Sequence, residues 1–302
     1  MTFGFATIAA DPAGASGDGF VAVRSGDRVA KLAALARCPR GADAARTFVD
    51  LLARWDDWCD EVEGALAAVE SGGCDWVNSV EYLPPVAAPT LYCAGANYVD
   101  HIEEMTGHRP ARGEGAPYHF VVPGGAVVGH ERTVRTPDGC TKLDWEIELA
   151  VVIGRRADHV KIADALDHVA GYSVANDISM RDFALRPDTP FGVDWLRSKA
   201  YATCLPLGPA VVPARFVPDP QDLSLRLWVG DELMQDSNTS EMLFSVAEQI
   251  EYLSAIVPLL PGDVISTGTP AGVGFARDRF LQPGEVVTAE IELVGQLVNR
   301  IT

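Results

Sequence analysis

Short apolar runs and one long helical pattern make up the first part of the chain. Residues 3–10 and 19–32 form apolar runs broken by Gly and Asp, which is typical of strands joined by turns. From about residue 44 to residue 70, apolar residues recur at steps of three and four, and this spacing predicts an amphipathic helix. Its apolar positions are Phe48, Leu52, Trp55, Cys59, Val62, Leu66 and Val69.

A linker and a domain boundary are predicted after this helix. Residues 71–89 contain two adjacent glycines and three prolines, which concentrate in loops. The 302 residues of the chain are enough for two domains of about 150 residues each. We therefore predict a small α+β domain over residues 1–85 and a larger domain over residues 86–302.

The larger domain has the pattern of a β-rich fold. Strand-like runs, separated by Gly, Pro or Asp, are found at residues 91–97, 126–135, 144–154, 169–177, 205–212, 223–230, 263–270, 286–295 and 296–301. Only residues 162–169 and 241–253 have a clear helical pattern in this part of the chain. Many strands and few helices predict an α+β, β-dominated fold, not a doubly wound βαβ fold.

Charge and cysteine content narrow the classes of function. The formal net charge of −18 predicts no binding to nucleic acid or to anionic membranes, because such a surface repels phosphates. The six cysteines include no C-x-x-C pair, so we expect reduced thiols. Because no run of about 18 apolar residues and no signal-like N-terminus is visible, we predict a cytoplasmic protein without a membrane span.

Three carboxylates in the run of residues 144–149 are the first candidate site. Side chains alternate between the two faces of a strand, so Asp144, Glu146 and Glu148 are expected on one face. Carboxylates this close repel one another unless a cation compensates them, and hard oxygen ligands favour Mg²⁺, Mn²⁺ or Ca²⁺. A solvated polar face of an amphipathic strand explains the same pattern.

Other candidate groups have equally ordinary explanations when each is taken alone. Asp177 follows an apolar run, where Asn-Asp is usually a turn. His101 and Glu104 are neighbours if their segment forms a helical turn, and such a carboxylate raises the basicity of the imidazole. Lys199 precedes a strand and could supply positive charge. The Gly-rich loop of residues 266–274 offers hydroxyls and backbone amides that suit a carboxylate.

In order along residues 91–301, these segments resemble the fumarylacetoacetate hydrolase family. The motifs are AGANYVDHIEE, LDWEIELAVVIG, VAGYSVANDISMRD, KAYATCLPLGP, LSAIVPLLPGDVISTGTPAGVG and LQPGEVVTAEIELVGQLVNRI. The resemblance implies a mixed β-roll catalytic domain that forms a homodimer and binds Mg²⁺ or Mn²⁺. It also implies a small-molecule 2-oxo or 1,3-dicarbonyl acid as the substrate.

The resemblance also implies roles for individual residues. The metal ligands implied are Glu146, Glu148 and Asp177, the catalytic residues are His101, Glu104 and Lys199, and the residues that bind substrate are Arg181, Thr269 and Gly268. Three positions depart from the pattern of many relatives, namely Ala184, Ala202 and Val122. The loss of polar side chains there leaves the exact substrate open.

The function predicted is metal-dependent hydrolysis of a C–C bond in a 1,3-dicarbonyl acid such as an acylpyruvate. The predicted metal chelates the 2-oxo acid, while His101 and Glu104 activate water and Lys199 stabilises developing negative charge. Decarboxylation, hydration or isomerisation of a 2-oxo acid can start from the same arrangement. A non-catalytic protein that binds a metal or a ligand is the alternative from another class.

Overall fold

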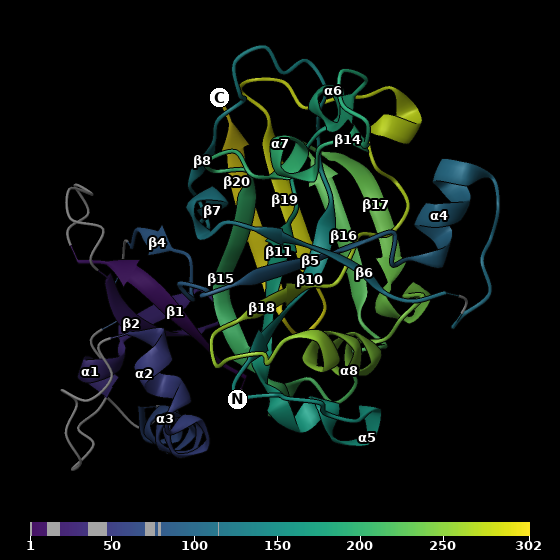
Figure 1. Cartoon of the computed structure of the whole chain (residues 1–302). Helices are drawn as coiled ribbons and strands as arrows, with labels where there is room; N and C mark the ends of the chain where they lie inside the picture. Colours follow the sequence, from purple (N-terminus) through teal and green to yellow (C-terminus); the bar gives the residue numbers. More distant parts are fainter. Residues whose placement is uncertain (1, 11–18, 36–46, 70–75, 78–79, 114) are drawn as a thin grey trace.

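Two large β-sheets carry the fold in this computed structural model, which describes residues 2–10, 19–35, 47–69, 76–77, 80–113 and 115–302 (Figure 1). The larger, eleven-stranded sheet has the order β3-β2-β1-β15-β11-β10-β18-β5-β6, with β4 on β1 and β7 on β15. Its strands are β1 (Gly4–Ala9), β2 (Gly19–Ser25), β3 (Arg28–Lys31), β4 (Tyr82–Leu83), β5 (Leu91–Gly95), β6 (Tyr118–Val122), β7 (Val127–Val128), β10 (Ile147–Ile153), β11 (Val169–Asn176), β15 (Leu205–Pro213) and β18 (Val264–Ser266). Parallel pairs, β5 with β18 and β7 with β15, make it a mixed sheet.

The second sheet has five strands in the order β17-β16-β19-β20-β8. These are β8 (Thr133–Val134), β16 (Ser224–Val229), β17 (Glu232–Asn238), β19 (Val286–Ile291) and β20 (Gly295–Ile301). β19 and β20 contact β11, and β16 contacts β10, so the second sheet packs on the larger one. The structure confirms the predicted α+β, β-dominated fold with mixed sheets.

β10 is buried on both faces, as its unbroken apolar sequence predicts. Leu149 and Val151 belong to the core shared with the second sheet, where Leu225 and Leu227 of β16 also lie. Val152, on the opposite face, belongs to the core beneath the N-terminal helices. The alternation of side chains along one strand therefore joins the two halves of the core.

The N-terminal strands extend the larger sheet. β1 pairs with β15 through Phe5 and Val211, so the sheet is continuous across the predicted boundary at residue 85, and the division into two domains stays a prediction. The prediction of one continuous helix over residues 44–70 was wrong. Helices α2 (Phe48–Leu52) and α3 (Trp55–Val69) replace it, while residues 44–46 and 70 lie outside the described part. α1 (Leu32–Leu35) is a single turn.

The helices of the larger part are shorter and more numerous than predicted. The helix expected at 241–253 is α8 (Val246–Ile256), and the helix expected at 162–169 is only α5 (Ile162–Ala165), since Val169 already begins β11. α4 (Val99–Thr106), α6 (Arg181–Ala184) and α7 (Trp195–Lys199) are too short to show a helical period. No helix among the described residues is long and apolar enough to cross a membrane.

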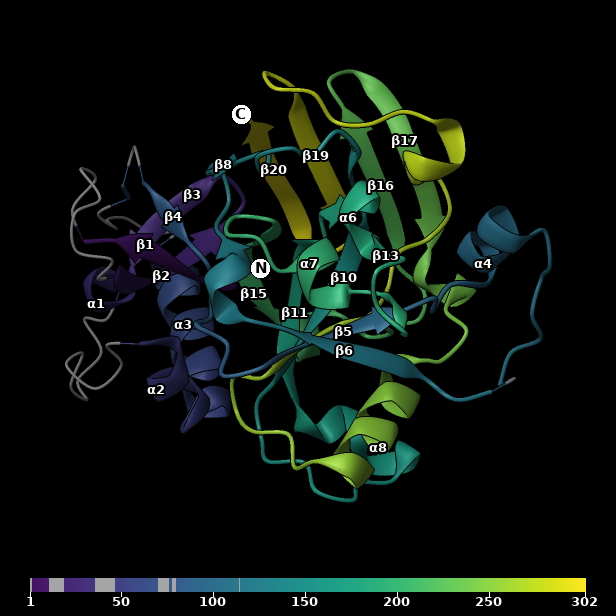
Figure 2. The ribbon, with the colours of Figure 1, turned by 45° about the horizontal axis from the view of Figure 1, so that its top comes forward.

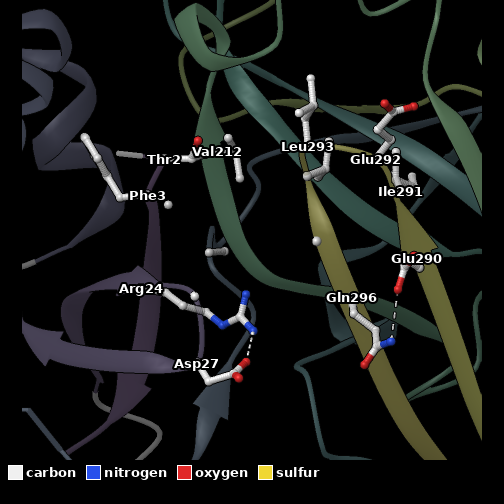
Figure 3. A pocket seen from close by; sticks show the side chains of 15 residues that line it. Thr2, Phe3, Arg24, Asp27, Val212, Glu290, Ile291, Glu292, Leu293 and Gln296 are labelled. Atoms are coloured by element: carbon white, nitrogen blue, oxygen red, sulfur yellow. Dashed lines mark hydrogen bonds and ion pairs between the residues drawn. The ribbon is translucent and has the colours of Figure 1, made fainter.

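A cleft of about 470 Å³ lies between the N-terminal strands and the turn that joins β19 to β20 (Figure 3). Arg24 and Asp27 line one side, with 3.7 Å between their charged groups, and Glu290 and Gln296 line the other. None of the predicted metal ligands lines this cleft. The predicted metal ligands therefore lie outside this cleft, deeper in the larger sheet.

Candidate functional site

Two adjacent strands, β10 and β11, bring the predicted metal ligands together. The strand expected over residues 144–154 is interrupted, because it divides into β9 (Leu143–Asp144), which pairs with β12 (Ser179–Met180), and β10. The interruption has a cause, since side-chain oxygens of Asp144 and Asn176 accept the N–H groups of Trp145 and Glu146 that a continuous strand would use.

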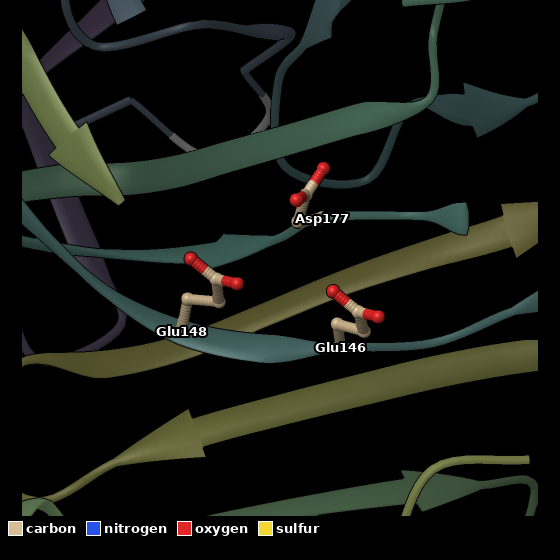
Figure 4. A group of neighbouring side chains, drawn as sticks. All are labelled: Glu146, Glu148 and Asp177. Carbon is tan, nitrogen blue, oxygen red and sulfur yellow. The ribbon is translucent and has the colours of Figure 1, made fainter. Parts of the chain in front are cut away.

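Glu146 lies just before β10, Glu148 lies within it, and Asp177 follows the adjacent β11. One carboxylate oxygen from each of the three residues lies within 4.8 Å of the other two, and all three side chains are buried (Figure 4). The alternation predicted from the sequence thus places Glu146 and Glu148 in one cluster, and strand pairing adds Asp177.

Lys199 is part of this cluster rather than a surface residue. It ends α7, whose N-terminus is capped by the side chain of Asp194, and its side chain is buried. The Lys199 Nζ lies 2.6 Å from Glu146 Oε2 and 2.7 Å from Asp177 Oδ2. Burial opposes ionisation of Lys199, but the two carboxylates outweigh it and raise its pKa, so Lys199 is a permanent cation here.

Arg181 holds the other side of Glu146. Its Nη2 lies 2.6 Å from Glu146 Oε1 and its Nε lies 2.8 Å from Asp144 Oδ2. Burial would raise the pKa of Glu146, but Lys199 and Arg181 lower it, so Glu146 is ionised. Asp144 also accepts hydrogen bonds from the backbone N–H groups of Gly274 and Phe275. These bonds connect the ion pair of Arg181 and Glu146 to the Gly-rich loop. Arg181, implied as a substrate ligand, is thus engaged with carboxylates of its own chain.

Glu148 and Asp177 have oxygens that no described protein group satisfies. Glu148 Oε2 accepts from Ser266 Oγ and, at 3.0 Å, from the N–H of Gly268, but its Oε1 and Asp177 Oδ1 are buried without a partner. The pKa of Glu148 is raised well above its usual range. Burial is the largest cause, followed by the negative charges of Asp177 and Glu146. An unpaired buried carboxylate oxygen is costly, so the cluster calls for a further cation.

The donor set fits a divalent cation. Together with the adjacent Asp144, the three carboxylates of the cluster carry a formal charge of −4 when all are ionised, and Lys199 and Arg181 balance half of it. The two orphaned atoms are themselves carboxylate oxygens, and such hard ligands suit Mg²⁺, Mn²⁺ or Ca²⁺. Glu146, Glu148 and Asp177 are therefore the residues that could hold it.

His101 and Glu104 lie one turn apart on α4, which stands at the side of the molecule away from α1–α3 in both views (Figure 1, Figure 2). His101 Nδ1 lies 3.6 Å from Glu104 Oε2, slightly beyond hydrogen-bonding distance. The N–H of Gly272 donates to both oxygens of Glu104, each at 3.0 Å. Partial burial would raise the pKa of Glu104, but His101 and the backbone N–H groups lower it, so Glu104 is a carboxylate beside the imidazole.

The Gly-rich loop links the dyad of His101 and Glu104 to the predicted metal ligands, because the N–H of Gly272 donates to Glu104 and the N–H of Gly268 donates to Glu148. Asn97, at the entrance to α4, fixes this placement because its side chain donates to the carbonyls of Phe244 and Thr267 at 3.0 Å and 2.8 Å. The described structure therefore brings the dyad, the metal ligands and Lys199 to one region.

The Gly-rich loop closes the site. Thr269 is buried, and its Oγ1 accepts a hydrogen bond from Gln235 at 2.9 Å. Gly268 has a φ of 95°, and a Cβ there would lie 2.8 Å from the Cβ of Asn97, so only glycine fits. Its N–H donates to Glu148, so Gly268 helps to hold a predicted metal ligand in place.

Two buried amides of the site, Asn97 and Gln235, were not singled out from the sequence. Asn97 follows an apolar run, which was the only available signal. Gln235 lies in β17, a segment for which no strand was predicted. When a polar residue lies in a mostly polar segment, the local sequence does not show that it is buried, because its hydrogen-bond partners come from distant strands.

Known proteins resemble this chain in both sequence and fold. The family model for the fumarylacetoacetate (FAA) hydrolase C-terminal domain matches residues 90–302. Among curated proteins, the chain is 41% identical over 227 residues to oxaloacetate tautomerase FAHD2B, mitochondrial, of Bos taurus, and the match covers 74% of this chain and 70% of that protein.

Solved structures extend the likeness to the whole chain. A putative HpcE protein from Mycobacterium smegmatis has a TM-score of 0.79 and 32% identity, and the match covers 99% of each chain. Fumarylpyruvate hydrolase from Pseudomonas aeruginosa, solved with Mn²⁺ and pyruvate, has a TM-score of 0.64 and 32% identity over 74% of this chain and 93% of that one. The N-terminal part of the described fold is thus also found in a solved relative.

Proposed function

The chain belongs to the fumarylacetoacetate hydrolase family, and from that premise we propose that it is a divalent-metal-dependent enzyme that acts on a 2-oxo acid. The observation that carries the proposal is the buried cluster of Glu146, Glu148 and Asp177 with its two unpaired oxygens beside the His101 and Glu104 dyad. A bound divalent cation would polarise the 2-oxo group and stabilise negative charge that develops on its oxygen.

The reaction we propose first is the interconversion of the keto and enol forms of a 2-oxo dicarboxylic acid such as oxaloacetate. The curated relative at 41% identity is named an oxaloacetate tautomerase. Tautomerisation needs one group that removes a proton from carbon and returns it, and a partly exposed imidazole is suited to this at neutral pH.

Each residue of the site has a separate role in this reaction. His101 takes a proton from the carbon beside the 2-oxo group, the C–H electron pair forms the C=C bond, and the carbonyl pair moves to oxygen. The oxygen gains a proton from water and the imidazolium of His101 gives its proton back to water, so the reaction is proton-neutral. Glu104 stabilises the imidazolium that forms and is itself held by the N–H of Gly272. Lys199 keeps Glu146 and Asp177 in place and ionised. The Thr269 hydroxyl donates to a carboxylate of the acid.

Hydrolysis of a C–C bond, the reaction predicted from the sequence, is the second candidate. The observation that favours it is the 32% identity to fumarylpyruvate hydrolase, whose solved structure contains Mn²⁺ and pyruvate. In this reaction His101 removes a proton from water, and the resulting hydroxide attacks the distal carbonyl of the dicarbonyl acid. The C–C bond between that carbon and the adjacent CH2 then breaks, its electron pair forms the enolate of the 2-oxo acid, and the enolate carbon takes the proton from the imidazolium. The two candidates therefore use the same base on different protons.

A substrate panel separates these candidates. Enol oxaloacetate, followed by the decay of its ultraviolet absorbance, and acylpyruvates, followed by release of pyruvate, are assayed with Mg²⁺ or Mn²⁺. Faster decay of enol oxaloacetate without release of product from acylpyruvates supports the tautomerase. Release of pyruvate alone supports the hydrolase, and no turnover in either assay contradicts an enzymatic role on 2-oxo acids and favours a non-catalytic binding protein.

A further inference from the structure

Gln235 joins the strand of the predicted metal ligands to the loop that carries Thr269. Its side chain is completely buried in β17. The amide oxygen accepts the N–H of Ile147, between Glu146 and Glu148, at 3.0 Å. The amide nitrogen donates to Thr269 Oγ1 and to the carbonyl of Pro270, each at 2.9 Å. Both amide hydrogens and the amide oxygen are therefore used.

The orientation of this amide is fixed by the main chain. The N–H of Ile147 can only donate, so the atom that faces it is the amide oxygen, and the carbonyl of Pro270 can only accept, so the atom that faces it is the nitrogen. An amide nitrogen donates and does not accept, so Thr269 Oγ1 must be the acceptor in the third bond. The hydroxyl hydrogen of Thr269 is directed elsewhere, and no described residue accepts it.

We infer that Gln235 is a positioning residue that presents the Thr269 hydroxyl as a donor to the carboxylate of a 2-oxo acid. The inference rests on the proposed function, because it requires an acidic ligand beside Thr269. A carboxylate bonds best to a donor whose hydrogen already faces it, since little rotation then has to be lost on binding. Gln235 supplies this fixed orientation without touching the ligand.

A purely structural role for Gln235 makes a different prediction. If Gln235 only connects β17, β10 and the loop, its loss weakens folding and metal binding whatever residue stands at position 269. If it acts through the hydroxyl, its loss has no further effect on ligand binding once the hydroxyl is absent. A double-mutant cycle between positions 235 and 269 separates the two roles.

The experiment is a calorimetric titration of the full chain, saturated with Mg²⁺, with oxalate as a planar dicarboxylate probe. Thr269→Val removes the hydroxyl, and Thr269→Ser retains it. Gln235→Met removes both donors without adding charge, and we expect oxalate to bind about 10-fold more weakly. In Gln235→Glu the new carboxylate takes the hydroxyl hydrogen of Thr269 for itself, so we expect a loss of about 10- to 100-fold.

Two controls accompany these variants. Gln249 is equally buried but lies in α8, where its amide donates to Phe244, so Gln249→Met should leave oxalate affinity within about 2-fold of the wild type. Mg²⁺ affinity of Gln235→Met, measured separately, should also stay within about 2-fold. A buried carboxylate can prevent folding. If Gln235→Glu does not fold, Gln235→Met alone tests the inference.

The outcomes are distinguishable. The inference is supported when Thr269→Ser binds oxalate as the wild type does and when Gln235→Met costs little in the Thr269→Val background. It is overturned when Gln235→Met binds oxalate normally, or when its full effect persists in that background. A wild-type protein that binds Mg²⁺ but no oxalate contradicts the proposed function, and the inference fails with it.

Discussion

Buried side chains of this protein take their chemical properties from neighbours that are distant in sequence. The spacing of Glu146 and Glu148 was enough to predict that both side chains lie on one face, because alternation on a strand is a local property. The ion pairs of Lys199 were not predictable from spacing, because they depend on where α7 packs. Gln235 had no local signal, because it is defined by bonds to residues 34 and 88 positions away.

The proposed base makes a direct prediction at the residue scale. His101→Ala should lower kcat by about 10²- to 10⁴-fold and leave Mg²⁺ affinity nearly unchanged, because the imidazole takes a proton and is not a ligand. Glu104→Gln should lower kcat in the same direction by a smaller factor. Steady-state kinetics and calorimetry measure the two quantities, and loss of Mg²⁺ binding in His101→Ala would show that His101 is a metal ligand.

His130 makes stability depend on pH. Burial and then Arg24 lower its pKa to about 4, and its Nδ1 accepts the N–H of Val298 at 3.0 Å. The unfolded chain has a histidine pKa of about 6.5, so the neutral ring stabilises the fold fully above pH 6.5 and this contribution is lost as the pH falls toward 4. We expect about 2 kcal/mol of this loss between pH 7.5 and pH 5.0.

Urea unfolding at the two pH values measures this loss. His130→Asn retains an acceptor for Val298 but does not titrate, so the difference in unfolding free energy between wild type and variant should change with pH. His159→Asn, at an exposed histidine, is the matched control and should follow the wild type. A parallel pH dependence in His130→Asn would contradict the assignment.

At the scale of elements, the predictions that failed were mainly those of where a helix begins or ends. α8 was expected from residue 241 but begins at Val246, where Ser245 and Glu248 form a capping box. The pattern Ser245-x-x-Glu248 was visible in the sequence and marks this start. The interruption between β9 and β10 had no such signal, because one of the two side chains that cause it, that of Asn176, lies on another strand.

The capping box of α8 can be tested by its effect on stability. Ser245→Ala removes the oxygen that accepts the N–H of Glu248, so the unfolding free energy should fall by about 1 kcal/mol. Glu248→Gln keeps an acceptor for the N–H of Ser245 and should cost less. Urea denaturation measures both variants, and an unchanged midpoint in Ser245→Ala would mean that the cap does not stabilise the helix.

At the scale of the whole molecule, the strand-rich pattern was enough to predict the fold class but not the order of strands. β1 and β15 pair through residues about 200 positions apart, and no local pattern specifies so distant a partner. The resemblance of the ordered motifs covered only residues 91–301, so it could not indicate that the N-terminal strands extend the same sheet.

Homodimer formation stays a prediction, and we propose the segment of residues 185–196 as the face that a second copy covers. Leu185, Phe191 and Leu196 are 69%, 88% and 63% exposed, so large apolar side chains are concentrated on this one segment. The chain carries a net charge of −18, so two copies repel one another except where the surface has both positive and negative side chains. Arg186 pairs with Asp188 and Asp194 within this segment, so the segment has a net charge of only −1 and two copies repel each other little there.

Light scattering tests this face. The wild type should have a mass of about twice 32.3 kDa at micromolar concentration, and Leu196→Glu should shift it toward 32.3 kDa. Ile256→Glu, at a similarly exposed position at the end of α8, is the matched control and should remain dimeric. A monomeric wild type would refute the dimer, and a dimeric Leu196→Glu would exclude this face.

The central claim is that Glu146, Glu148 and Asp177 bind a divalent cation on which catalysis depends. The most direct measurement is calorimetric titration of Mg²⁺ or Mn²⁺ into the wild type and Glu148→Ala, with the rate of enol oxaloacetate decay measured on the same samples. We predict binding of one cation and metal-dependent turnover in the wild type, with both lost in Glu148→Ala, whose folding is checked by circular dichroism. Equal metal affinity in a folded Glu148→Ala, or turnover that persists with a chelator present, would contradict the account.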